Sequence, residues 1–177
     1  MSEFTKANLV TIMPTCAGRI DPWIGFLNAA AEEFEFDFPL RRAAFIAQAA
    51  HECAEFKFMK ELASGEAYEG RKDLGNTQLG DGARFKGRGI FQLTGHANYD
   101  QVGYDLFLDR DWFSMNPALA ELPEYACRIA GWFWKKNGLS QLADDQDFRG
   151  ITKRINGGYN GWSDRLAYYE RAKAVLL

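Results

Sequence analysis

The sequence predicts a mainly α-helical protein, a single domain over residues 1–177 with a groove between two lobes and at most a small hairpin. Three observations predict this fold class. Apolar residues recur at helical spacing in several segments, strand signals are weak, and a glycine-rich stretch at about 64–89 interrupts the helical pattern. A chain of 177 residues is long enough for one full hydrophobic core and too short for two large domains.

The first predicted helix begins at Asp21 and Pro22, a capping side chain followed by the residue favoured in the first helical turn. Its apolar stripe should face the core and consists of Trp23, Phe26, Leu27, Ala30 and Phe34.

A second helix is predicted after Pro39, through the segment LRRAAFIAQAAHE. Its alanines permit close packing against neighbours. Phe45, Ala49, Glu52 and Phe56 recur at the spacing of one helical face, so we expect Glu52 on the apolar side of this helix.

Periodicity then disappears in a loop-rich insertion at about 64–89, which is longer than compact domains usually contain without a functional reason. Its glycines are Gly65, Gly70, Gly75, Gly80, Gly82, Gly87 and Gly89. A later helix is predicted from Pro123 to a stop at Gly138, and another over residues 147–155 before Gly157. Ser163 is expected to cap a final helix.

Composition excludes several classes of function. Hydrophobic residues make up 47% and charged residues 25% of the chain, and no stretch approaches the roughly 20 apolar residues of a membrane span. A net charge of -3 argues against a protein dedicated to duplex DNA, so no nucleic-acid partner is expected. His51 and His96 lie far apart without an HExxH pattern, and we expect no metal site.

The three cysteines are odd in number and include no CxxC pair. We expect free thiols in a reducing compartment, not a disulfide framework. No convincing signal peptide is visible, because charged residues and a proline interrupt the apolar residues near the N-terminus. The cysteines are Cys16, Cys53 and Cys127. The residues that interrupt the N-terminal segment are Glu3, Lys6 and Pro14.

Glu52 and Glu61 are the candidate catalytic acids. A carboxylate on an apolar helix face is penalised in its charged form, so Glu52 is interpreted as a general acid that keeps a proton near neutral pH. The alternative is that Glu52 ends its helix and pairs with an arginine such as Arg88. Glu61 is interpreted as the general base; the alternative is a solvated charge beside Lys57 and Lys60.

Geometry constrains this pair of acids. One unbroken helix would separate Glu52 and Glu61 by about 13.5 Å of rise and half a rotation. That is too far for two carboxylates that hold a water between them at the roughly 6.5–9.5 Å of inverting glycosidases. We therefore expect the helix to stop after about Cys53 and the chain to turn, so that the two acids face each other across a cleft.

The segment KGRGIFQLTGHANY suggests recognition of a polyol. Gln92, Thr94 and Asn98 alternate with Phe91 and Leu93, which would place amides and a hydroxyl on one side and apolar groups on the other. The alternative is that these polar residues cap turns and the glycines serve loop geometry. Basic residues at 84, 86 and 88 would lie beside the cleft, where they could attract an anionic polymer, although at least one of them should simply face solvent.

Several linked motifs in this order resemble glycoside hydrolase family 19, the chitinase-like group, and most closely its bacteriophage endolysin branch. They are AAHE, GDGxxFKGRGxxQLTGxxNY, and INGGYNG followed by DR, and the resemblance covers roughly Arg41 to Tyr169. It implies a lysozyme-like, chitinase-like helical domain with a substrate groove between its lobes.

The resemblance also implies roles for individual residues. Glu52 matches the catalytic acid, Glu61 the second catalytic glutamate, and Thr94 the hydroxyl residue that helps hold the attacking water. Positions implied in binding of substrate or water fall on Gln92, Asn98 and Asn156, and Arg88 is added as a candidate substrate-binding residue from its place beside the cleft. Arg165 resembles an arginine of a supporting charge network.

Two positions depart from the plant-type chitinase pattern. Asn160 stands where those enzymes generally have a glutamate, which weakens the expected charge network and a strong role for Arg165. Ala97 stands in place of a tyrosine, which removes an aromatic contact and makes chitin less secure as the substrate.

The resulting hypothesis is an endolysin that hydrolyses β-1,4 bonds of peptidoglycan glycan strands without a cofactor, as a monomer. Alternatives are a chitinase, a lytic transglycosylase, or a non-catalytic carbohydrate-binding module. The endolysin branch further implies accumulation in the host bacterial cytoplasm and action at the cell wall after release through a separate membrane pore.

Overall fold

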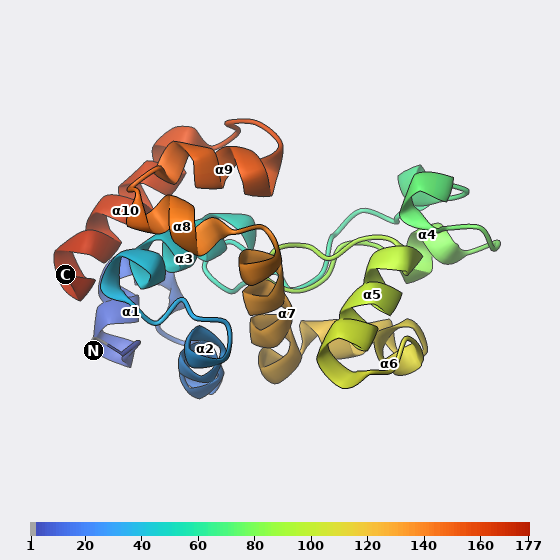
Figure 1. Ribbon diagram of the computed structural model, residues 1–177, viewed down its shortest axis with the longest axis horizontal. Helices are drawn as coiled ribbons and strands as arrows, with labels where there is room; N and C mark the ends of the chain where they lie inside the picture. Colours follow the sequence, from blue (N-terminus) through green and yellow to red (C-terminus); the bar gives the residue numbers. More distant parts are fainter. Residues whose placement is uncertain (1–2) are drawn as a thin grey trace.

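The computed structural model describes residues 3–177, so Met1 and Ser2 of the expected domain lie outside the described residues. Figure 1 shows two lobes joined by a narrow waist of irregular chain, with one helix standing beside it. The large lobe contains α1 (Lys6–Ile12), α2 (Asp21–Glu33), α3 (Pro39–Glu52), α8 (Leu139–Asp144), α9 (Phe148–Asn156) and α10 (Trp162–Leu176). The small lobe contains α4 (Asp81–Arg84), α5 (His96–Phe107) and α6 (Asp111–Ser114), and α7 (Pro123–Lys136) stands between the lobes.

The waist and the glycine-rich insertion contain little regular structure. Short 3-10 turns occur at Glu66–Tyr68 and Lys72–Leu74, as they do at Pro14–Cys16 and Pro117–Glu121 elsewhere. In residues 3–177 the only strand-like pairing consists of isolated antiparallel bridges from Arg88 to Lys60 and to Leu93. The predicted fold class, mainly α-helical with at most a small hairpin, is therefore confirmed.

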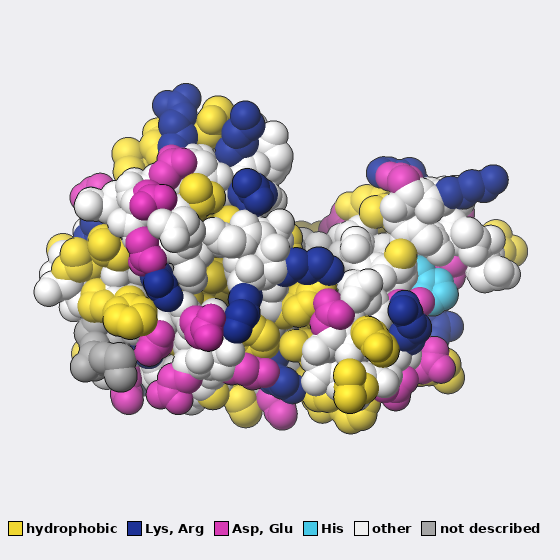
Figure 2. Space-filling view, viewed as in Figure 1, with side chains coloured by type: hydrophobic (Ala, Val, Ile, Leu, Met, Phe, Trp, Pro, Cys, Tyr) yellow, Lys and Arg dark blue, Asp and Glu magenta, His cyan; other side chains and the backbone are white. Residues whose placement is uncertain are grey.

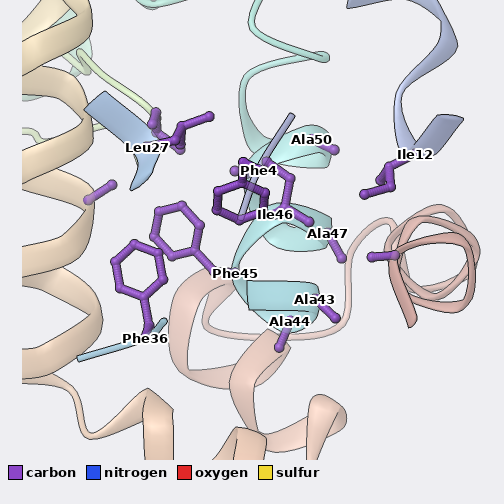
Figure 3. Close-up of a cluster of buried hydrophobic side chains, with 14 of the residues drawn as sticks. Phe4, Ile12, Leu27, Phe36, Ala43, Ala44, Phe45, Ile46, Ala47 and Ala50 are labelled. Atoms are coloured by element: carbon purple, nitrogen blue, oxygen red, sulfur yellow. The ribbon is translucent and has the colours of Figure 1, made fainter. Parts of the chain in front are cut away.

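Helix α3 is the centre of the large lobe. Its alanines, among them Ala43, Ala47 and Ala50, are fully buried and have side chains small enough to let α10 pack closely. Figure 3 shows Phe36 and Phe45 on the side of α3 nearer α7, away from Ala43 and Ala47. The two rings stack with centroids 4.1 Å apart, and burial of one such side chain stabilises the fold by about 2–3 kcal/mol.

A second cluster of buried side chains fills the small lobe. It consists of Phe85, Tyr99, Val102, Phe113, Ala120 and Ile129. Leu106 of α5 and Trp132 of α7 pack against both clusters, so the two lobes share apolar contacts.

Five predicted helices correspond to α2, α3, α7, α9 and α10, and two details of the prediction are wrong. Phe26 is 39% exposed, so the buried stripe of α2 is narrower than the spacing suggested. Ser163 lies inside α10, which begins at Trp162; the residue before it, Gly161, has φ 71 and caps the helix without a side-chain hydrogen bond.

The strand-like alternation expected around Gln92 is also wrong. Gln92 has φ 53 and occupies a tight turn in which the backbones of Arg88 and Leu93 exchange hydrogen bonds. Asn98 lies further on, in the first turn of α5. A positive φ is disfavoured for residues other than glycine, and this turn explains why the period of two does not continue.

No helix within residues 3–177 is both long enough and apolar enough to span a bilayer.

Candidate active site

Glu52 is the last residue of α3, and the chain reverses direction immediately after it. Cys53 caps the helix, and Ala54, Glu55 and Phe56 then adopt φ of 49, 55 and 65. Three consecutive left-handed residues cannot continue a right-handed helix. The reversal is held by backbone hydrogen bonds from Glu55 to Ala50 and from Phe58 to Cys53, of 2.8 and 3.1 Å. The predicted stop and turn after about Cys53 are confirmed.

The Glu52 carboxylate faces a buried cation and not the apolar environment that we expected. The alternative interpretation, that Glu52 ends its helix and pairs with an arginine, matches the structure, but the arginine is Arg165 and not Arg88. The Glu52 side chain is 18% exposed, and Oε1 lies 2.6 Å from Nη2 of Arg165, which is 1% exposed. Oε1 makes no well-aligned hydrogen bond, so the contact is best described as an ion pair. The expectation fails because helical spacing locates Glu52 on the inner face but gives no information about a side chain 113 residues later.

Arg165 is itself fixed by two further hydrogen bonds. Nη1 donates to Oε1 of Gln48 at 2.6 Å, and Nε donates to the backbone oxygen of Asn160 at 3.0 Å. Gln48 in turn donates to the Thr152 hydroxyl at 2.8 Å. The side chains of Arg165, Gln48 and Thr152 are buried, and they connect α3, α9 and α10 behind Glu52. Arg165 therefore contacts Glu52 directly although position 160 is an asparagine, and its role in the reaction remains a prediction.

The loop before α10 is ordered by two side chains next to this network. Asn156 Oδ1 accepts a hydrogen bond from the backbone nitrogen of Asn160 at 3.3 Å. His51 Nδ1 lies 2.7 Å from Asp164 Oδ2, and the His51 ring packs so closely on Gly161 that a Cβ there would lie 2.1 Å from Cε1. Asn156 thus shapes the segment beside Glu52; its contact with substrate or water remains a prediction.

Glu61 lies on the other side of the reversal, in the waist. Its backbone nitrogen donates to the oxygen of Gly87 at 2.9 Å. Its two carboxylate oxygens accept hydrogen bonds from the Tyr68 hydroxyl at 3.1 Å and from the Gly87 nitrogen at 3.2 Å. These bonds orient the carboxylate, so a solvated charge beside Lys57 and Lys60 does not describe its environment.

Gly87 brings Glu61 and Gln92 together. A Cβ at Gly87 would lie 2.7 Å from Gln92 Oε1 and 3.3 Å from Glu61 Oε2, so a side chain at this position would displace one of the two. Gln92 is held by a 2.9 Å bond to the Gly89 oxygen, and the Thr94 hydroxyl donates to the Gln92 oxygen at 2.9 Å. The amide nitrogen of Asn98 donates to the Thr94 oxygen at 2.7 Å.

Gln92, Thr94 and Asn98, but not Glu61, line a pocket of about 370 Å³ between the waist and α7. The residues around it are Leu74, Phe91, Gln92, Leu93, Thr94, Asn98, Trp132, Phe133, Lys136 and Asn137. Figure 2 shows a wide hollow between the two lobes, with Lys and Arg side chains (dark blue) along its floor and its left edge. The sequence motif QLTGHAN therefore contributes to one wall of a pocket, and α7 supplies the other.

Arg88 is a correction to the set of predicted substrate-binding residues. It is 9% exposed, and its guanidinium donates to Glu121 at 2.9 Å, to Tyr99 at 3.1 Å and to the backbone oxygens of residues 84 and 86. A guanidinium with its donors committed in this way supports the hairpin that carries Glu61. Arg84 likewise donates to the oxygen of Ser114, and Lys86 to that of Ala63.

Sequence reasoning missed Tyr68 and Glu55. Tyr68 contacts Glu61 directly, and burial together with that carboxylate raises the pKa of its hydroxyl, which favours the protonated donor form. Glu55 is buried next to the reversal, where Thr15 and Tyr168 donate to its oxygens. The only sequence signal for Tyr68 was its position as an aromatic residue within the glycine-rich insertion.

In residues 3–177 no group of three or more His, Cys, Asp or Glu side chains could hold a metal ion. Cys16, Cys53 and Cys127 are buried thiols, and burial raises the pKa of Cys53 to about 12. A thiol with such a high pKa is a poor nucleophile at neutral pH.

The described residues form a helical fold of two lobes, with Glu52 at the end of α3 and Glu61 in the waist. Comparison with known proteins finds this fold in glycoside hydrolases of the chitinase class. No family model matches the chain. Over 110 residues it is 34% identical to a glycosyl hydrolase family 19 domain-containing protein of Haemophilus influenzae, a match that covers 62% of this chain and 51% of that protein. An endochitinase of Arabidopsis thaliana is 35% identical over 116 residues, or 66% of this chain and 39% of the endochitinase. The chain thus spans about half or less of the length of these curated relatives.

Solved structures agree with this similarity. Chitinase C from Streptomyces griseus superposes with a TM-score of 0.77 at 21% identity, over 97% of this chain and 91% of the chitinase. A family 19, class IV chitinase from Zea mays gives a TM-score of 0.64 at 22% identity, over 98% and 82% of the two chains. The fold is that of the family 19 chitinases, and the sequence is similar to the named relatives over 62% and 66% of this chain.

Proposed function

We propose that this chain is a glycoside hydrolase that cleaves β-1,4 bonds in the glycan strands of peptidoglycan. The observation that carries the proposal is that the structure holds each of two glutamates in a fixed position. Glu52 and Glu61 are both half-buried, each is held by dedicated partners, and the reversal at residues 54–56 separates them. Hydrolysis of a glycosidic bond requires two carboxyl groups, one that protonates the leaving sugar and one that activates a water.

In this proposal Glu52 protonates the leaving sugar. Arg165 contacts Oε1, which leaves Oε2 as the oxygen that carries the proton toward the glycosidic oxygen. After the proton has moved to the glycosidic oxygen, Glu52 is a carboxylate, and the Arg165 cation stabilises that charged form. Arg165 also fixes the direction in which that proton points.

Glu61 and Thr94 act on the attacking water. Glu61 accepts a proton from the water, and its orientation is fixed by Tyr68 and Gly87. The Thr94 hydroxyl donates to the Gln92 oxygen, so its own oxygen is free to accept a hydrogen bond from the same water. Attack from the face opposite the acid would invert the configuration of the sugar.

Two polymers, peptidoglycan and chitin, are candidate substrates. Peptidoglycan is supported by the motif pattern of the endolysin branch and by the cations along the groove. Chitin is supported by the names of the relatives, which include endochitinases of Arabidopsis thaliana and Zea mays. As an endolysin, the protein would act as a monomer and would reach the wall through a separate membrane pore.

Parallel digestions test the proposal. Purified peptidoglycan and soluble chitin oligomers are each incubated with the wild type, with E52Q and E61Q, and with E66Q as the control, because Glu66 is exposed on the same segment. The wild type and E66Q should release reducing ends from peptidoglycan, and the other two should not. Cleavage of chitin alone would overturn the choice of substrate.

Mass spectrometry of the products distinguishes hydrolysis from transglycosylation. Hydrolysis adds one water for each bond broken, whereas a lytic transglycosylase leaves 1,6-anhydro ends and would not need Glu61. Anhydro products that persist in E61Q would therefore contradict the two-carboxylate mechanism. Binding without any cleavage by the wild type would favour a carbohydrate-binding module.

A further inference from the structure

The pocket beside Gln92 and Thr94 has one charged wall residue. Of the ten residues that the structure places around it, only Lys136 is ionised, and the others are apolar, amide or hydroxyl side chains. Lys136 lies in the last turn of α7, and its side chain is about half exposed, at 49%. It therefore places a positive charge across the pocket from the residues expected to contact sugar.

The Lys136 ammonium is only weakly engaged. Nζ lies 4.4 Å from the centre of the Trp132 ring and 3.8 Å from Asp105 Oδ2. Asp105 Oδ2 already accepts a hydrogen bond from Trp132 Nε1 at 2.8 Å, and Oδ1 accepts from Gln101 at 2.7 Å. No described residue accepts a hydrogen bond from Nζ, so its three N–H donors remain available for a ligand.

Neighbouring contacts hold this wall in place and add positive charge. Asn137, which also lines the pocket, donates to the Phe133 oxygen at 2.8 Å. Arg154 of α9 donates to the Asn137 oxygen at 3.3 Å and is otherwise exposed. A second cation thus stands beside Lys136 where α7 faces the groove.

We infer that this pocket is a carboxylate-binding subsite and that Lys136 binds an acidic group attached to the glycan. The inference rests on the proposed glycosidase function and names a determinant of its specificity. A glycan whose sugars carry a lactyl or peptide carboxylate would gain a charge-assisted hydrogen bond to Nζ. A neutral chain of N-acetylated sugars has no group to make that contact, so the subsite discriminates between the two polymers.

Lys135 provides a matched control. It adjoins Lys136 in the same last turn of α7, so both lysines interact equally with the helix dipole. Lys135 Nζ, however, lies 3.2 Å from Glu35 Oε2 and Lys135 does not line the pocket. K135Q and K136Q therefore remove the same charge from the same helix end, and only the second alters the subsite.

The experiment measures kcat and KM for the wild type, K135Q and K136Q on two soluble substrates. One is a glycan strand of alternating N-acetylglucosamine and N-acetylmuramic acid with free carboxylates, and the other is a chitin oligomer of equal length. We expect K136Q to raise KM about tenfold on the acidic glycan, the size of one hydrogen bond to a charged group, and to change neither constant on chitin. K135Q should behave as the wild type on both.

Three results would overturn the inference. They are an equal effect of K136Q on both substrates, an equal effect of K135Q and K136Q on the acidic glycan, and wild-type cleavage of chitin but not of the acidic glycan. In the first two cases cleavage of the acidic glycan by the wild type leaves the proposed function standing, whereas in the third the glycosidase activity stands and the choice of peptidoglycan falls. Equal melting temperatures of the wild type and both lysine variants show that all three proteins are folded. If the folded wild type then cleaves neither substrate, the proposed function is wrong, and so is the inferred subsite.

Discussion

The two candidate catalytic acids are held in opposite ways. Glu52 ends a long buried helix and faces a cation that ties three helices together. Glu61 lies in irregular chain and is held by a tyrosine hydroxyl and a backbone nitrogen. The acid side is thus built into the core of the large lobe, whereas the base side depends on a few local hydrogen bonds. This difference predicts that changes at Glu52 and Arg165 affect both folding and activity, and that changes at Glu61 and Tyr68 affect activity alone.

The largest expected effect is the loss of kcat when either acid is replaced, and the melting temperature then distinguishes the two acids. E52Q and E61Q should each lower kcat by about 10²–10⁴-fold, the usual contribution of general acid–base catalysis. E52Q also leaves Arg165 facing a neutral amide in a buried position, so its melting temperature should fall, while that of E61Q should stay close to the wild type. Reducing-end assays and thermal melts of both variants make the comparison. Equal melting temperatures for E52Q and the wild type would contradict the structural role of the ion pair.

The next effect concerns Arg165. Replacement of one partner of a buried ion pair strands the other, so R165M should destabilise the fold by about 3–5 kcal/mol. It also removes the donor to Gln48. Urea unfolding measures the change, and R165K is the informative control, because it keeps the charge but cannot contact Glu52, Gln48 and Asn160 together. If R165M unfolds at the urea concentration of the wild type, the network behind Glu52 contributes little.

A smaller effect concerns Tyr99, which contacts the chain near Gly87, and it should appear as a loss of folding stability at high pH. Burial raises the pKa of Tyr99 from 10.0 to about 12, and its hydroxyl donates to the oxygen of Lys86 and accepts from Arg88. Because the folded-state pKa lies above the unfolded one, this contribution is fully present below about pH 10 and is lost as pH rises toward about 12. For a pKa shift of this size, Tyr99 contributes about 2–3 kcal/mol to the free energy of unfolding.

Y99F should therefore lose less stability than the wild type over that pH range. Urea midpoints at pH 8 and pH 11 measure the loss for each protein, and Y104F, which changes an exposed tyrosine of the same helix, should follow the wild type. A wild-type loss no greater than that of Y99F would show that ionisation of Tyr99 is not coupled to folding.

The acid side could be predicted largely from the sequence. Helix starts at Asp21 and Pro39 follow from local capping and proline rules, and the alanines of α3 mark a helix packed on several sides. The geometric requirement that Glu52 and Glu61 approach each other correctly placed the end of α3. What the sequence could not supply was the environment of Glu52, because Arg165 belongs to the last helix and no local pattern connects positions so far apart.

The base side was harder to predict for a different reason. Its conformation depends on residues other than glycine with positive φ, such as Gln92, and on single hydrogen bonds such as that from Tyr68. Neither leaves a periodic signal. Arg88 illustrates the consequence: a basic residue in a glycine-rich loop suggested an exposed cation, and the fold instead buried it against Glu121. Polar residues in irregular chain can be recognised from sequence, but whether they face the groove or the core depends on tertiary contacts.

The smallest expected effect is at Tyr68, which distinguishes orientation of the base from stability of the fold. Y68F removes only the hydroxyl that donates to Glu61. Loss of one hydrogen bond to a carboxylate corresponds to about 1.5–3 kcal/mol at most, and in a partly exposed site we expect a fall in kcat of about tenfold or less, with KM nearly unchanged. The hydroxyl stays protonated through the neutral range because its pKa is raised, so the difference between Y68F and the wild type should be constant from pH 5 to pH 8. The melting temperature should not change, since the ring that remains keeps its packing; a drop in melting temperature with unchanged kcat would mean that Tyr68 supports the insertion and does not orient Glu61.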